Sequence, residues 1–450
     1  MKKAPQIVLF AVLAITVWLA PSGAIPAETT KIDKQIGGLT LKEAVDYAVV
    51  HNPSILKAQS EIAASHGDVI KARSHFLPKL EANGGVEQSI HQDIVTVKAG
   101  TFGNPTDIPF PLTSKTIPYA SLKLEQLIYD FGLSTNKYRE ATLGEQISSQ
   151  IKDLTSQDIA LRVVNAYLDV LLARKKIELA KSTLDAYESH YQTAEKLYQA
   201  GSIPKSDLLA ANFTRSRAAL DLDGARNDVH IAELNFEKVV GLKPGELDRR
   251  IIAFHKPAYT LEDKVGYAKE HRLELAVNDG LQKIAQAQKS QATSSYLPKF
   301  LVKGEVTYRD DSYLAHKDQV RVLAGMQWSL FDGLAAYGAR KRAEASKDAS
   351  GYSRESLLDQ IEVEVTRAHL DLEQAVRAID VAKKNMEDAT ENLRIVKERY
   401  AAGDAPATDV LDGIRGWSSA SYNHVEAIYT LNLNIARLKR ATGENITGEL

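Results

Sequence analysis

Cysteine is absent from the 450-residue sequence, which excludes disulfides, thiolate metal ligands, thiol nucleophiles and the acylated cysteine of a bacterial lipoprotein. Proline and glycine are scarce, at 14 and 26 residues, and this leaves room for long regular elements. The 56 basic and 58 acidic side chains nearly cancel, so the basic face of a nucleic-acid-binding protein is not indicated. The 11 histidines form no H-E-x-x-H pair, and no serine lies in G-x-S-x-G. We therefore expect neither an enzyme nor a cofactor or metal site.

The first 27 residues have the pattern of a secretory signal peptide. Lys2 and Lys3 precede an apolar run over residues 7–20, and small residues follow, with cleavage expected after Ala24 or Ala27. The run is shorter than the roughly 20 residues that a membrane-spanning helix needs, and no later segment reaches that length. Any part of the mature chain that enters a membrane is therefore expected to consist of strands.

The rest of the chain consists of two sequence repeats. "LTLKEAVDYAVVHNP" from Leu39 matches "YTLEDKVGYAKEHRL" from Tyr259 at an offset of 220, and the offset falls to 202 between the first and second strands of each repeat. The first repeat is predicted over residues 39–243, with strands at about 78–90 and 119–129. A linker at 244–258 leads to the second repeat over residues 259–445, with strands at about 298–310 and 319–331. The extra residues of the first copy, around "HQDIVTVKAGTFGNPTDIPFPLTSKT", are predicted to form a long exposed loop between two strands.

Each long helix carries a heptad seam. From Ile159 to Tyr198 the apolar residues step by four and three, and the seam recurs 202 residues later from Ile361 to Tyr400. This period predicts coiled-coil packing rather than burial in a globular core. Residues 133–200 contain no proline and would extend about 100 Å as one helix. The flanking helices, at about 41–76 and 206–240, are each about half as long, so two of them stacked end to end would match one long partner.

The predicted strands alternate apolar and polar residues, as Phe300, Val302 and Val306 do with Lys303 and Glu305. This pattern fits a half-buried sheet on a soluble core or the wall of a membrane barrel. The barrel is favoured because no other segment supplies a second apolar layer. Four strands cannot close a barrel, so copies must share one; a dimer or a trimer would give eight or twelve strands, and only twelve leave an aqueous lumen.

Several motifs, in this order and in duplicate, resemble the TolC-like outer membrane efflux proteins over essentially the whole mature chain. They are the two repeat starts quoted above, the paired "LPK" corners at Leu77 and Leu297, "LIYDFG" and "SLFDG", and the turns "YQAGSIPKSDLL" and "YAAGDAPATDVLD". The resemblance implies a mainly α fold with transmembrane β structure. In it a duplicated helix-strand-strand-helix-helix unit forms a trimeric 12-stranded β-barrel joined to a long α-helical barrel.

That resemblance also implies the function: an outer membrane channel-tunnel of a tripartite efflux or type I secretion system in a Gram-negative bacterium. Such a tunnel passively conducts cargo across the periplasm and the outer membrane. The implied partners are two further copies of the chain, outer membrane lipid, a periplasmic adaptor protein and an inner-membrane pump.

The two helix-to-helix turns hold the expected site residues. Asp409 and Asp412, at i and i+3, share one helix face, and a three-fold assembly would stack them as two rings of carboxylates that attract cations. The family assigns these positions to the pore constriction. It also implies a gate latch, a hydrogen bond between Tyr400 and Asp207. Because Ala405 replaces a basic residue that some members use in a second link, we expect a less tightly held entrance.

Adaptor docking is expected on both exposed turns, where the resemblance places the adaptor tips. The residues are Gly201, Ser202, Ile203, Pro204, Lys205, Gly403, Asp404, Ala405 and Pro406. The alternative interpretation of the whole chain is a periplasmic structural coiled-coil or adaptor protein without pore activity. That alternative predicts a protein that is soluble without detergent and does not conduct ions.

Overall fold

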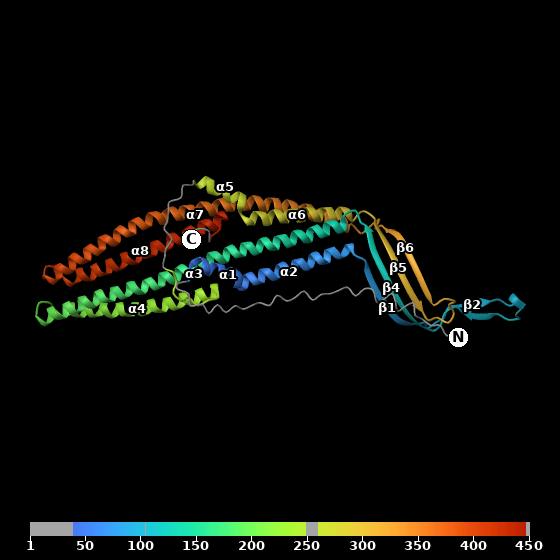
Figure 1. Ribbon diagram of the computed structural model, residues 1–450, viewed down its shortest axis with the longest axis horizontal. Coiled ribbons are helices and arrows are strands. Elements are labelled where there is room, and N and C mark those ends of the chain that lie inside the picture. Colours follow the sequence, from blue (N-terminus) through green and yellow to red (C-terminus); the bar gives the residue numbers. More distant parts are fainter. Residues whose placement is uncertain (1–38, 104, 249–259, 447–450) are drawn as a thin grey trace. The chain divides into compact units, whose positions relative to one another are not determined.

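The computed structural model describes residues 39–103, 105–248 and 260–446, and Figure 1 shows the helices and strands that they form. The expected signal peptide, residues 1–27, lies outside the described residues, as do residues 249–258 of the expected linker. Among the described residues, every helix falls short of the length or the apolarity that a membrane crossing requires.

One series of elements occurs twice. The first series is α1 (Leu41–His51), α2 (Pro53–Arg73), η1 (Ser74–Phe76), β1 (Lys79–Gln88), β4 (Thr116–Tyr129), α3 (Leu133–Gln199) and α4 (Lys205–Val240). The second is α5 (Leu261–His271), α6 (Leu273–Ser294), β5 (Lys299–Arg309), β6 (Asp318–Gln327), α7 (Ala335–Ala401) and α8 (Ala407–Thr442). The helices α3 and α7 both have 67 residues and α4 and α8 both have 36, so the length of each is the same in both copies.

The first helix of each copy, predicted as one segment, is broken by a single extended residue. Asn52 separates α1 from α2 with φ −65° and ψ 132°, and Arg272 separates α5 from α6 with φ −66° and ψ 127°. In the first copy Pro53 begins α2, and the Asn52 side chain accepts a hydrogen bond from the Ser54 amide at 2.9 Å. The second copy has no proline there, and ion pairs to Glu274 and Glu364 hold Arg272. The prediction of one unbroken helix over residues 41–76 is therefore wrong.

The long helices pack along the predicted heptad seams. In Figure 1, α4 lies along one part of α3 and α2 along another, and α8 and α6 divide α7 in the same way. The two repeats of the chain meet where α3 of the first repeat also contacts α6 and α8 of the second. Fully or nearly buried seam residues of α3 and α7 include Ile159, Val163, Ala166, Val170, Ala173, Ala180, Tyr187, Ala194, Ile361, Val365, Leu372, Ala375, Leu393 and Tyr400.

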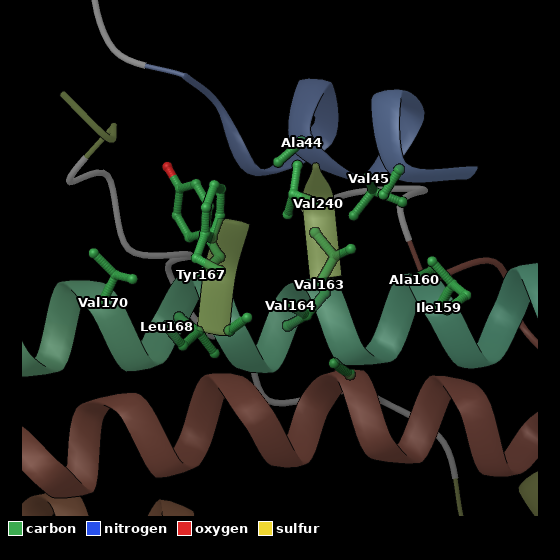
Figure 2. Close-up of a cluster of buried hydrophobic side chains, with 14 of the residues drawn as sticks. Ala44, Val45, Ile159, Ala160, Val163, Val164, Tyr167, Leu168, Val170 and Val240 are labelled. Atoms are coloured by element: carbon green, nitrogen blue, oxygen red, sulfur yellow. The ribbon is translucent and has the colours of Figure 1, made fainter. Parts of the chain in front are cut away.

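The largest apolar cluster joins the start of the first repeat to the middle of α3. Figure 2 shows Ala44 and Val45 of α1 above Val163 of α3, with Val240 at the end of α4 between them. The buried Tyr167 of α3 donates its hydroxyl to the carbonyl oxygens of Leu39 and Asp248, each at 2.9 Å. Burial raises the pKa of Tyr167 to about 12, so the hydroxyl stays protonated as a donor. This cluster fixes the middle of the helix bundle.

The main sheet has four antiparallel strands in the order β1-β4-β5-β6, so β1 and β6 are its two unpaired edges. The register aligns one apolar row across the strands, formed by Ala82, Leu122, Val306 and Val320. On the opposite face a charged row runs Glu81, Lys123, Glu305 and Arg321, in which Lys123 and Glu305 lie 3.5 Å apart. The apolar face is open, since 73% of Val320 is exposed.

The last strand is shorter than predicted. β6 ends at Gln327, not near residue 331, because Trp328 turns back and donates its indole N–H to the carbonyl of Tyr296 at 2.9 Å. The chain then bends at Gly333 and Leu334, which have φ of 68° and 70°, before α7 begins. Left-handed backbone at two successive residues is incompatible with a strand.

The long loop of the first copy contains structure that the sequence did not predict. Within it, β2 (Ile94–Val97) pairs with β3 (Ile108–Pro111) as an antiparallel hairpin, with η2 (Thr101–Gly103) between them. In Figure 1 this hairpin lies beyond the four-stranded sheet, on the side away from the helices.

Candidate functional site

The two helix-to-helix turns have the same backbone. Gly201 and Gly403 take left-handed φ values of 74° and 81°, and their amides donate to the carbonyls of Tyr198 and Tyr400 at 2.9 and 3.1 Å. The next amide reaches back further, as Ser202 does to Leu197 at 2.8 Å, so each helix ends in a Schellman motif. Pro204 and Pro406 then cap α4 and α8.

The expected docking residues lie where the sequence placed them, at the ends of the two helical hairpins. Gly201, Ser202, Pro204, Lys205, Gly403, Asp404 and Pro406 are exposed, while Ile203 and Ala405 are half-buried. Ala405 packs against the apolar cluster beneath the turns. Arg399 donates to the carbonyl of Asp404 at 3.0 Å, which stiffens the second turn.

The turns are held together by apolar packing. Buried residues from both hairpins meet there, namely Ala186 and Tyr187 of α3, Ala218 of α4, Leu393 and Tyr400 of α7, and Ala407, Val410, Leu411 and Ile414 of α8. Thr183 and Ser418 add a hydroxyl-to-hydroxyl contact of 2.9 Å between α3 and α8. Neighbouring residues line a groove of about 390 Å³ between α4 and α8, with Arg217, Asp221 and Arg415 on its walls.

The hydrogen bond implied between Tyr400 and Asp207 is not formed in this structure. The Tyr400 hydroxyl is buried and has no hydrogen-bond partner among the described residues, while Asp207 accepts from the Ser206 hydroxyl at 3.2 Å. Asp207 is still close enough to act by its charge: burial, and then the negative charge of Asp207, raise the pKa of Tyr400. The assignment of these two residues to a gate latch stays a prediction.

Sequence reasoning missed His190, whose ring lies 5.1 Å from that of Tyr400. Only 4% of His190 is exposed, and its Nε2 atom also has no hydrogen-bond partner among the described residues. Burial and then the positive charge of Lys397 lower its pKa to about 4, although Asp207 opposes the shift. His190 lies outside the heptad seam, and the matching position of the second copy is Asn392, so neither pattern pointed to it.

A second missed residue changes the predicted constriction. Asp409 is half-buried and Asp412 is exposed in the first turns of α8, and Asp412 forms an ion pair with Arg415 at 2.7 Å. The aspartates are three residues apart, and Arg415 continues the same spacing, so the helix face bears both signs. In a three-fold assembly the Asp412 carboxylates would therefore have the Arg415 guanidinium groups beside them.

Charged side chains from four helices form a network in the middle of the bundle. Arg272, 7% exposed, donates to Glu274 at 2.7 Å, to Glu364 of α7 at 2.6 Å, and to the carbonyl of Ala441 in α8 at 3.1 Å. Arg440 of α8 joins Glu274 to Asp158 of α3, at 3.0 and 2.8 Å. Burial would raise the pKa of Glu274, but the hydrogen bonds and charge of Arg272, with the charge of Arg440, outweigh it and lower the pKa to about 2. The network joins the first and second repeats of the chain.

Comparison with known proteins agrees with this geometry. A family model described as outer membrane efflux protein matches residues 44–242 and 265–444. The chain is 25% identical over 432 residues to Protein CyaE of Bordetella pertussis, covering 91% of this chain and 85% of that protein. It is 21% identical over 417 residues to outer membrane protein TolC of Vibrio cholerae, covering 90% of each. The crystal structure of the outer membrane protein VceC from Vibrio cholerae is 17% identical, with a TM-score of 0.74 over 90% of this chain and 96% of that one. The structural likeness confirms the predicted fold class.

Proposed function

The chain belongs to the outer membrane efflux protein family, and on that basis we propose that three copies of it form one conduit from the periplasm through the outer membrane. It is an outer membrane channel-tunnel of a Gram-negative bacterium that serves an efflux or type I secretion system. Members of the family are channels rather than enzymes, and they work as trimers with adaptor proteins and inner-membrane pumps.

The observation that carries the proposal is the four-stranded sheet with two unpaired edges. β1 and β6 run antiparallel to each other, because three antiparallel pairings separate them, so β6 of one copy can continue the ladder with β1 of the next. Three copies give twelve strands, and the closed ring leaves no free edge. The open apolar row through Leu122 and Val306 would face lipid, and the charged row through Lys123 and Glu305 would face the lumen.

The helices support the same assembly, because exposed apolar stripes run along α4 and α7. On α4 the stripe contains Leu209, Phe213, Leu220, Ile231 and Leu234; on α7 it contains Val363, Leu370, Val381 and Ile395. Their spacings of 3, 4, 7, 11 and 14 residues are those of a coiled-coil seam. Since α3, α6 and α8 occupy the contact between the two repeats, these stripes are free to pack on neighbouring copies.

At the turns, we assign Asp409 and Asp412 to the constriction, where the positive charge of Arg415 partly offsets the negative charge of Asp412. We assign Gly201–Lys205 and Gly403–Pro406 to adaptor docking. The support is their common position at the ends of the two helical hairpins and the exposure of most of the docking residues. Replacing both aspartates by asparagine should lower cation-over-anion permeability. The control Asp380→Asn, an exposed position of α7 away from the turns, should leave it unchanged.

Planar-bilayer conductance of the purified protein, with lysine-reactive cross-linking to count subunits, tests the proposal. We expect ion conductance and a cross-linked trimer in detergent. Protein that stays monomeric and leaves the bilayer insulating would support a structural coiled-coil role instead.

A further inference from the structure

The β2–β3 hairpin has one wholly apolar face. The register pairs Val95 with Phe110 and Val97 with Ile108, so these four side chains share a face. Ile94, Thr96, Pro109 and Pro111 lie on the other face, where Thr96 is the one polar side chain. Of this face, 47% of Val95 and 56% of Phe110 are exposed. Within the described chain β2 and β3 pair only with each other. A two-stranded hairpin is marginally stable in water, so this face needs a partner.

The hairpin grows directly out of the edge of the main sheet. Beyond β1 and β4, the Ser89 amide donates to the carbonyl of Lys115 at 2.9 Å, and the Leu112 amide donates to the carbonyl of Asp93 at 2.8 Å. These hydrogen bonds extend the β1–β4 ladder up to β2 and β3. Because β1 is an unpaired edge strand, the hairpin stands at the boundary where a neighbouring copy would join.

A second small apolar patch lies in the loop between β5 and β6. The carboxylate of Asp311, 2% exposed, accepts hydrogen bonds from the Ser114 amide at 3.0 Å, the Ser114 hydroxyl at 2.8 Å and the Tyr313 amide at 3.1 Å. These hydrogen bonds fix the β5–β6 loop to Ser114, just before β4 of the same subunit. They leave Tyr313 and Leu314 with 50% and 36% of their surfaces exposed.

We propose that Tyr313 and Leu314 of one copy cover the apolar face of the β2–β3 hairpin of the next copy, an inference that rests on the proposed trimer. When β6 pairs with β1 of the next copy, the two strands lie about 4.8 Å apart. The β5–β6 loop of the first copy then stands beside the hairpin of the second. Each loop is clamped to its own hairpin base through Ser114 and packs on the neighbouring hairpin, so the three outer loops form a continuous collar around the channel mouth.

The surface that covers the hairpin face belongs to a second copy of this chain. The hairpin face and the Tyr313–Leu314 patch are different surfaces of the chain, so the patch of one copy can meet the hairpin of the next. A ring of identical subunits needs this kind of contact, in which one patch meets a different patch on the neighbour. The contact also continues the β6–β1 boundary, so it needs no further rearrangement of the strands.

Paired cysteines test the contact, and the absence of native cysteine makes the result free of background. The variant Val95→Cys with Leu314→Cys should oxidise into a covalent trimer on a non-reducing gel. The matched control Thr96→Cys with Leu314→Cys places its cysteine on the opposite face and should stay monomeric. Lysine-reactive cross-linking of both reduced variants checks that each assembles.

A membrane-impermeant maleimide applied to whole cells adds a second measurement. The thiol of the single variant Val95→Cys should react several-fold more slowly than the thiol of the single variant Thr96→Cys. If lysine cross-linking gives a trimer but the 95–314 pair stays monomeric, the collar is overturned and the proposed function stands. Protection at position 95 without the disulfide also overturns it, in favour of outer-leaflet lipid as the occupant. Loss of the lysine-linked trimer in the wild type would instead overturn the proposed assembly itself.

Discussion

Replacing Glu274 by glutamine should destabilise the protein by about 3 kcal/mol at neutral pH. The pKa of Glu274 falls from 4.5 to about 2 in the folded protein, since Arg272 and Arg440 outweigh the effect of its burial. Each pKa unit corresponds to about 1.36 kcal/mol, so this lowering corresponds to about 3 kcal/mol of folding free energy. The side chain is only 22% exposed, so solvent screens these contacts little.

The sign of the pH dependence follows from the lowered pKa. The stabilisation is fully present above about pH 4.5, where an unfolded glutamate is ionised, and it is lost as the pH falls towards about 2. Guanidinium unfolding followed by far-ultraviolet circular dichroism should show the wild type and Glu274→Gln converging over this range. The control is Glu61→Gln, which breaks the exposed Lys57–Glu61 pair of 3.6 Å and should cost under about 1 kcal/mol at any pH.

The reasoning is refuted if Glu274→Gln costs no more at neutral pH than an exposed ion pair, about 0.2–1 kcal/mol. It is equally refuted if the two unfolding curves keep a constant separation down to about pH 2. Either result would mean that Arg272 and Arg440 do not hold the Glu274 carboxylate in the folded protein.

Three further outcomes are expected at the turns. Gly201→Ala and Gly403→Ala should each lower the free energy of unfolding by about 1–2 kcal/mol, because φ is 74° and 81°. An added Cβ meets no atom within 4 Å at either site, so the cost comes from the backbone conformation alone. Gly224→Ala, in the interior of α4, should stabilise the protein instead, and equal effects at the three sites would contradict the backbone argument. Tyr400→Phe should raise the melting temperature and should not increase channel opening, since the buried hydroxyl has no partner among the described residues and its burial costs stability. A latch to Asp207 would instead make Tyr400→Phe and Asp207→Ala both increase opening. Because the pKa of His190 is lowered to about 4, the packed turns keep full stability above about pH 6.5 and lose it as the pH falls towards 4. Channel opening should therefore rise on acidification in the wild type but not in His190→Leu, and the same pH profile in both proteins would exclude His190 as the cause.

The parts of the fold that the sequence predicted are those set by local periodicity. The heptad seam from Ile159 and the missing prolines predicted a helix over residues 133–200, and α3 runs from Leu133 to Gln199. The break at Asn52 has a local signal in Pro53, since proline favours the first position of a helix. The break at Arg272 has none, because its partners come from helices far apart in the chain, such as Glu364 in α7.

In the candidate site, too, the sequence predicted the features set by neighbouring residues but not those set by the packing of distant helices. Glycine and proline spacing predicted both turns, since a helix stop and a helix start depend on neighbouring residues. The pairing of Asp412 with Arg415 is also local, because it follows from their i, i+3 spacing on α8. The surroundings of Tyr400 could not be predicted from the sequence, because whether its hydroxyl reaches Asp207 depends on how α4 and α7 lie relative to each other. The β2–β3 hairpin was hidden by Pro109 and Pro111, which argue against a strand except at an edge.

The packing of the bundle middle and of the turns differs, and this bears on how the turns would separate. The middle is fixed by the cluster around Val163 and by the Arg272 network, in which each charge has hydrogen-bonded partners. The turns rest on an apolar cluster that buries two polar atoms without a partner among the described residues, His190 Nε2 and the Tyr400 hydroxyl. Each such atom costs about 1–3 kcal/mol while the turns are packed, and water removes that cost when they separate. Other buried atoms of this kind, such as His369 Nδ1 of α7 and Asn432 Oδ1 of α8, lie away from the turns. If the turns form the entrance, as proposed, separating them would release the cost of His190 Nε2 and the Tyr400 hydroxyl.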